Sequence, residues 1–398
     1  MTTAPTRLSL VGGEFLVNLS RGAMTLSLGF FLYRLTGNVW AFALASITEL
    51  FVALLLRNVS ANAVDGLGAR RVMMVACLSL AAILGAVSLA GDLYGYNVWL
   101  ALAVALLLSI IRVFQNAAGY AAVVVYAGNR IESINSALSV ALQAGQLAGV
   151  IVAGATLELM TLNTLCLLTG LSYLGAALFY RRLPVVARIP RPAVHPGAPD
   201  RERIPLHLKL YGVLATFDFA LAGVFNLLLA PAVAAAFGGA PRWMTILDVN
   251  YTAGAIFSGM LLVAFSARCR SFRWFPSLFS SLMAIACFLA LYHQKGVLLY
   301  LVVFLFGFAS TSSYMFWTSI SQSETPAQLS GRVGAMKGIF NSLALALASM
   351  MLTIANIADQ SLLLPFALAF CAMTLVGALL IVEYLSRASR SRPAVAGP

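Results

Sequence analysis

Three polar side chains interrupt the first apolar stretch of the sequence on what would be one face of a helix. Glu14, Asn18 and Arg21 are spaced four and three residues apart, so an α-helix brings them to the same side. A carboxylate there could accept a proton or pair with a cation, and the guanidinium could bind an anion. A structural ion pair between Glu14 and Arg21 is the alternative, as is a position of Glu14 close to lipid headgroups.

Further ionisable residues lie inside later apolar stretches, namely Glu49, Arg112 and Asp218. A charge at the centre of a bilayer costs about 2.5–3.5 kcal/mol on insertion scales, so the presence of each of these residues requires a structural or functional explanation. We expect the carboxyls of Glu14, Glu49 and Asp218 to carry protons, because loss of water favours the neutral form. Arg112 would favour the charged form of a nearby carboxylate. Packing hydrogen bonds, ion pairs or an Arg bound to carbonyls at a helix end are the alternatives.

Polar and aromatic side chains in the same stretches are candidates for binding a substrate. A site for a large amphiphilic ligand is mostly apolar with a few polar groups. Tyr314 and Trp317 follow a hydroxyl-rich run at 310–313, although an aromatic belt at the membrane interface is the alternative for Trp317. The candidates for substrate binding are Asn18, Arg21, Gln115, Gln143, Asn226, Tyr314 and Trp317.

The composition places these residues in a membrane protein. Of the 398 residues, 61% are hydrophobic and 10% are charged, whereas soluble chains have roughly 45–50% apolar and about 25% charged residues. A chain of this length cannot hide that excess in one core, so much of its surface faces lipid. The five cysteines are scattered and predict neither a disulfide framework nor a metal site. No P-loop, HExxH or GxSxG motif occurs, so we expect no enzyme and no ATP-driven pump.

Long apolar runs predict about twelve transmembrane helices, because a span needs about 20 apolar residues and these runs lack the alternation of barrel strands. Twenty of the 25 Lys and Arg residues, Arg332 and Lys337 among them, fall in loops on one side, which predicts that this side and both termini are cytoplasmic. The net charge of +12 is therefore assigned to the membrane rather than to nucleic acid. The predicted spans are 8–34, 38–57, 72–91, 97–120, 135–157, 161–180, 208–232, 244–266, 275–293, 297–317, 335–356 and 362–384.

A proline-rich hydrophilic segment divides the spans six and six. The predicted domains are an N-terminal half at 1–180, a cytoplasmic linker at 181–207, a C-terminal half at 208–386 and a cytoplasmic tail at 387–398. The loops before the fifth and eleventh spans resemble each other, since both place a basic residue and a short polar stretch before a helix of small residues. Two six-helix halves around a central cavity are typical of one large class of transporters.

The loop between the second and third spans carries a family resemblance. Residues 61–71, ANAVDGLGARR, resemble the signature loop of the major facilitator superfamily, G-x-x-x-D-R-x-G-R-R, with Asp65, Gly68 and Arg70 in register. The resemblance implies that these three residues form a conformational-switch loop. Asp65 would cap a helix start and pair with an Arg of a neighbouring helix, and Gly68 would permit a tight turn. Gly66 replaces the first arginine of the motif, so part of the family's charge network is missing.

Two further resemblances narrow the branch. Residues 112–116, RVFQN, resemble the R-x-x-Q-G motif in the fourth span of proton-coupled members, with Asn in place of Gly. Residues 31–56, 133–154 and 330–333 resemble the twelve-span drug and siderophore exporters, which include enterobactin exporters and macrolide efflux proteins.

These resemblances imply a secondary active transporter that uses the proton gradient to export a small or medium organic molecule, a siderophore ahead of a lipophilic drug. We expect a monomer in the cytoplasmic (inner) membrane of a bacterium, with no bound cofactor and no nucleic-acid partner. Import of a siderophore or nutrient and flipping of a lipid are the alternatives that the sequence leaves open. A receptor or assembly factor that transports nothing is a more distant one.

Overall fold

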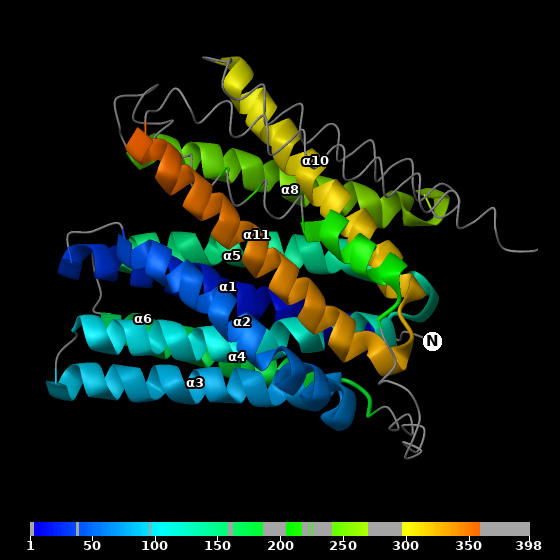
Figure 1. The fold of residues 1–398 in the computed structure, drawn as a ribbon, viewed down its shortest axis with the longest axis horizontal. Coiled ribbons are helices and arrows are strands. Elements are labelled where there is room, and N and C mark those ends of the chain that lie inside the picture. Colours follow the sequence, from blue (N-terminus) through cyan, green and yellow to red (C-terminus); the bar gives the residue numbers. More distant parts are fainter. Residues whose placement is uncertain are drawn as a thin grey trace, which may run out of the picture.

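In the computed structural model the chain is built from long helices (Figure 1). The structure describes residues 4–36, 40–94, 97–157, 162–185, 204–216, 222, 225, 241–269 and 297–358. Its helices are α1 (Ala4–Thr36), α2 (Trp40–Leu67), α3 (Ala69–Tyr94), α4 (Val98–Tyr126), α5 (Ile131–Leu157), α6 (Leu162–Arg181), α8 (Pro241–Cys269), α10 (Val297–Glu324) and α11 (Ser330–Ala358). Residues 206–216 are also helical, and no strand occurs among the described residues. The prediction of an all-α fold is confirmed for the described residues.

Each of these helices covers one predicted span to within two residues at its start, but several helices are longer than predicted. α2 ends at Leu67 rather than at residue 57, α10 ends at Glu324 rather than at 317, and α11 begins at Ser330 rather than at 335. The bilayer limits the apolar part of a helix, whereas the backbone hydrogen bonds continue beyond it. The predicted spans 275–293 and 362–384 and the tail 387–398 lie outside the described residues, as do most of the linker and most of the span 208–232.

The outer surface of the helices is apolar, as expected for contact with lipid. Phe51, Leu55, Trp99 and Leu171 are 61%, 76%, 79% and 62% exposed, respectively. Among the described residues, five helical stretches are long and apolar enough to cross a membrane: Ala69–Gly91, Val98–Tyr126, Ile131–Ala153, Asn163–Arg181 and Leu298–Glu324. Exposed apolar surface of this extent is unfavourable in water and favourable in a bilayer.

The helices pack as two groups. In the first group α1 lies against α5 and α6, α3 against α4 and α6, and α2 against α4; in the second, α8 lies against α10. The groups meet where α5 contacts α8 and α10 and where α11 contacts α2 and α4. Figure 1 shows α11 crossing between α10 and the helices of the first group. Short 3₁₀ turns precede α5 and α11, at Gly128–Arg130 and Ala327–Leu329, the two loops whose sequences resemble each other.

The contact between α1 and α5 depends on a glycine. A Cβ atom at Gly149 of α5 would collide with the backbone carbonyl of Leu19 on α1, so the two backbones touch at this point. Such a close approach allows dispersion contacts between helices that have no hydrophobic effect to hold them together in lipid.

We predict that Gly149→Ala destabilises the protein. Overpacking costs about 1–3 kcal/mol in well-packed interiors, so the thermal midpoint of the detergent-solubilised protein should fall. Gly85→Ala is the matched control, because a Cβ atom at Gly85 of α3 meets nothing within 4 Å. The control should be as stable as the wild type or slightly more so, since Ala favours a helix over Gly. Equal midpoints for the two variants would contradict the close contact of α1 and α5.

Candidate functional site

Glu14 and Asn18 form a hydrogen-bonded pair on α1. The buried side-chain amide of Asn18 donates to the carbonyl oxygen of Glu14 and to its carboxylate Oε1, both at 2.8 Å. Arg21 is close enough to interact electrostatically with the same carboxylate. The predicted set on α1 therefore lies together in the structure, and Asn18 is engaged with Glu14.

The face that carries Glu14 points into the first group of helices. Leu10, Val17 and Met24, which flank Glu14 on this face, belong to the hydrophobic core formed with α3, α4 and α6. Glu14 is within electrostatic range of Cys77 on α3 and of Tyr180 on α6. We expected this face to look into a cavity between the halves; the contacts given for the described residues are with the first group of helices, and the cavity stays a prediction. Helical spacing fixes which residues share a face, but it does not say which neighbour that face meets.

The two residues of the fourth-span motif lie near the same place. The amide nitrogen of Gln115 is 3.8 Å from the sulfur of Cys77. Arg112 is within electrostatic range of Tyr173 on α6, and so is Arg21. These residues from α1, α3, α4 and α6 form one group, which we call the N-half cluster: Glu14, Asn18, Arg21, Cys77, Arg112, Gln115, Tyr173 and Tyr180.

Sequence reasoning missed three members of the N-half cluster, Cys77, Tyr173 and Tyr180. All three are at most 1% exposed, and the hydroxyl of Tyr180 has no hydrogen-bond partner among the described residues. Tyr173 and Tyr180 are seven residues apart, which places them on one face of α6. That spacing was the available signal. A tyrosine hydroxyl next to a carboxyl could take part in proton transfer.

Of the other candidates, some lie outside the described residues and the rest are not members of this cluster. Asp218, Asn226 and the side chain of Glu49 lie outside the described residues. Gln143 is half-buried on α5. Trp317 is 1% exposed and packs in an apolar cluster.

The signature loop joins α2 to the start of α11. Asp65, in the last turn of α2, accepts a hydrogen bond from the backbone N–H of Gly331 at 3.0 Å, and its other oxygen is 3.9 Å from Nε of Arg332. The acceptor therefore sits at the positive N-terminal end of α11. Gly68 follows α2 with φ of 86°, a conformation that favours glycine, and Arg70 donates to the carbonyl of Arg181 at 2.7 Å.

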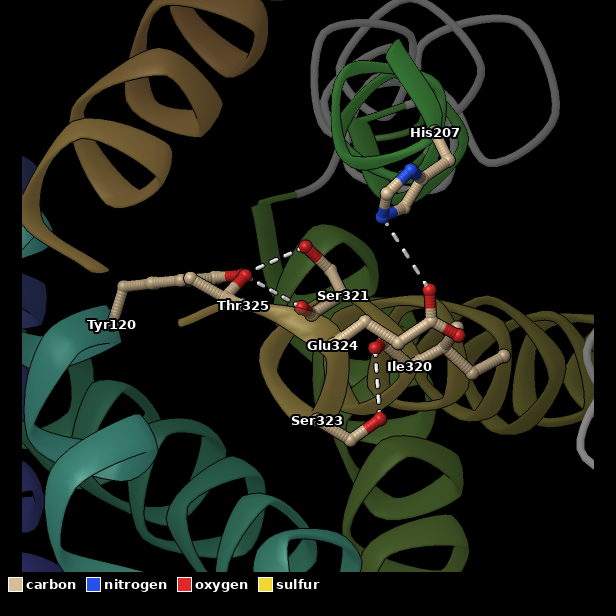
Figure 2. Close-up of polar contacts among 7 residues, drawn as sticks. All are labelled: Tyr120, His207, Ile320, Ser321, Ser323, Glu324 and Thr325. Atoms are coloured by element: carbon tan, nitrogen blue, oxygen red, sulfur yellow. Dashed lines mark hydrogen bonds and ion pairs between the residues drawn. The ribbon is translucent and has the colours of Figure 1, made fainter. Parts of the chain in front are cut away.

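A second set of polar contacts joins the two groups of helices, and we call it the seam. The hydroxyl of Tyr120 on α4 shares hydrogen bonds with Ser321 at 2.7 Å and with Thr325 at 3.1 Å (Figure 2). The amide of Asn135 on α5 donates to the hydroxyl of Ser319 at 2.8 Å and to Oε1 of Gln322 at 2.5 Å. All six residues of the seam are buried: Tyr120, Asn135, Ser319, Ser321, Gln322 and Thr325.

The seam lies at one end of the bundle. Its residues lie near the end of α4, the start of α5 and the end of α10, which is the end that carries the N-terminus (Figure 1). The sequence analysis missed the seam because Ser319, Ser321 and Gln322 lie in the part of α10 beyond the predicted span and Thr325 follows that helix, whereas Tyr120 and Asn135 lie at the very ends of their predicted spans. The polar run at 319–325, SISQSET, was the available signal.

We predict that Asn135→Ala loosens this end. Loss of a buried hydrogen bond costs about 1–3 kcal/mol, which shifts a two-state population roughly 5- to 150-fold. Spin labels at the exposed positions Arg130 and Gln328, in a background without native cysteines, should report a longer distance in the variant. Asn97→Ala, which removes the side-chain cap at the other end of α4, is the control and should leave the distance unchanged. An unchanged distance in Asn135→Ala would show that the seam does not hold the two groups together.

Solved structures share this fold, although no family model and no curated protein matches the sequence. A bacterial homologue of the iron transporter ferroportin in an outward-facing state superposes with a TM-score of 0.74 at 16% identity, over 96% of this chain and 99% of the other. The human organic anion transporter MFSD10 (TETRAN) gives 0.74 at 13% identity, over 95% and 99%. Both are described as transporters and neither as an enzyme. The chain shares the fold of these two membrane transporters.

Proposed function

We propose that the chain is a proton-coupled secondary transporter that works by alternating access. The seam carries this proposal: two groups of helices are held together at one end by buried hydrogen bonds between hydroxyl and amide side chains. Water can replace such bonds when the end opens, so open and closed forms can differ by only a few kcal/mol. Two such arrangements of rigid helix groups are what alternating access requires.

The N-half cluster supplies the proposed site of proton coupling. Glu14 shares the interior of the first helix group with the guanidinium groups of Arg21 and Arg112 and with the hydroxyl of Tyr180. Protonation of Glu14 would raise the net charge of the cluster by one unit, and the cost of that change depends on how far water reaches it. If water reaches the cluster to a different extent in the open and closed forms, protonation of Glu14 shifts the populations of these forms. Proton binding is then coupled to the conformational change.

The predicted orientation assigns the seam to one side of the membrane. With the basic loops in the cytoplasm, the end closed by the seam is the cytoplasmic one, and the structure is an outward-facing form. The outward-facing state of the ferroportin homologue supports this assignment. We propose export of a small or medium organic molecule, with a siderophore ahead of a lipophilic drug because of the branch resemblance. The two similar structures are described as transporters of different substrates, so the fold itself does not identify the transported molecule.

Substrate accumulation in a deletion strain tests the function. Cells without the protein should retain the siderophore or drug, and cells that express it should release it until an uncoupler collapses the proton gradient. Release that persists with the uncoupler would contradict proton coupling. A deletion strain that secretes normally but fails to use the supplied molecule would instead indicate import.

We predict that Glu14→Gln uncouples transport. The variant keeps the hydrogen-bonding shape but cannot release a proton, so proteoliposomes with an imposed pH gradient should no longer concentrate the substrate. Exchange of labelled for unlabelled substrate should persist. Glu324→Gln, a change at a carboxylate whose side chain is 42% exposed, is the matched control and should retain uphill transport. Uphill transport by Glu14→Gln would exclude Glu14 as the coupling residue.

A further inference from the structure

Lys337 is buried where α11 meets the first group of helices. It lies two turns into α11 and is 7% exposed. We counted it among the loop cations in the orientation argument, but it falls inside the predicted span 335–356 and the structure places it within α11. Lysine is almost never this deeply buried unless its ammonium has a partner.

The described partners of the Lys337 ammonium carry no full negative charge. Nζ of Lys337 donates to the hydroxyl of Thr318 at 2.6 Å and lies 4.2 Å from the ring centre of Tyr314. The ring of Tyr120 is farther, at 6.0 Å. A hydroxyl oxygen and the negative faces of aromatic rings attract a cation, but neither carries a full charge.

No carboxylate of the described residues pairs with Lys337. The described ion pairs near this end, Asp65 with Arg332 and His207 with Glu324, involve other groups. Burial of a cation in a low-dielectric interior is unfavourable until a counter-ion joins it. The place beside Lys337 is therefore electrostatically suited to an anion.

We propose that Lys337 binds the anionic group of the transported molecule, so that the substrate is an organic anion that carries a carboxylate or a similar group. This inference rests on the proposed transport function and narrows it. A siderophore, which chelates iron through acidic oxygens, fits it, whereas a lipophilic cation does not. Tyr314, a predicted substrate-binding residue, belongs to the same site.

The position of Lys337 at the junction of the two groups gives it a role in the transport cycle. Tyr120 comes from α4 of the first group, whereas Thr318 and Tyr314 come from α10. When the seam opens, Tyr120 moves away and the ammonium becomes accessible from that end. When the anion has left, the hydroxyl and the rings hold the ammonium in its place, so that the empty site can close.

Charge-selective binding to the full-length protein tests the proposal. The probes are salicylate, 2,3-dihydroxybenzoate and citrate, each compared with its amide, and the readout is the thermal midpoint as a function of probe concentration, because binding stabilises the folded state. At least one carboxylate should bind at least tenfold more tightly than its amide. Lys337→Met should remove that preference and Lys337→Arg should keep it.

Lys209→Met is the matched control, because it makes the same chemical change at an exposed lysine near the same end. It should bind the probes as the wild type does. If no carboxylate is preferred over its amide by the wild type, or if Lys337→Met keeps the preference, the proposal is wrong.

A protein carboxylate as counter-ion is the rival explanation, and Asp218, which lies outside the described residues, is the residue to test. If Asp218 neutralises Lys337, each of Lys337→Met and Asp218→Asn will destabilise the protein and the double variant will recover, which would overturn the proposal. Additive effects of the two changes would support it.

The two proposals fail in distinguishable ways. Proton-driven transport of a neutral or cationic molecule, with no preference for carboxylates, would support the transport function and contradict the anion site. Carboxylate binding that depends on Lys337, without proton-driven movement of any probe, would support the anion site and contradict the proposed transport function.

Discussion

The hydrogen bonds of the seam are the constraint on which the rest of the structure depends. They join α4 to the end of α10, close to the place where α11 packs against α2 and α4. They also determine that Lys337 is covered by Tyr120. A seam of apolar side chains could hold the same helices together, but in lipid it would give no preference for one pairing over another. Directional bonds between hydroxyls and amides give that preference and can still be replaced by water.

The two polar regions of the protein have different surroundings. The N-half cluster lies inside one rigid group of helices, so a change of charge there alters that group first. The seam and Lys337 lie between the groups, where any relative movement changes their contacts. Two helices run between the two regions: α4 carries Arg112, Gln115 and Tyr120, and α5 packs against α1 and carries Asn135.

The sequence predicted the helices well and the contacts between them poorly. Apolar length identifies a span, and the positions of Glu14, Asn18 and Arg21 on one face follow from helical spacing alone. The sequence could not show that this face meets α3 and α6, because that depends on packing over long separations in the chain. Nor could it show the seam, since Tyr120 and Asn135 have partners almost two hundred residues away. The seam residues lie near helix ends, whereas the candidates predicted from charge lie inside the spans.

The contact between Asp65 and Gly331 has a consequence for how the signature loop can vary. The acceptor binds a backbone N–H, which every residue except proline provides, so the chemical type of side chain at position 331 is immaterial. Its volume is not, because a Cβ atom there would collide with the Asp65 carboxylate. A loop that uses the main chain of a helix end as its partner can join α2 to α11 without an arginine at position 66. Substitution at position 331 is therefore limited by the volume of the side chain more than by its charge.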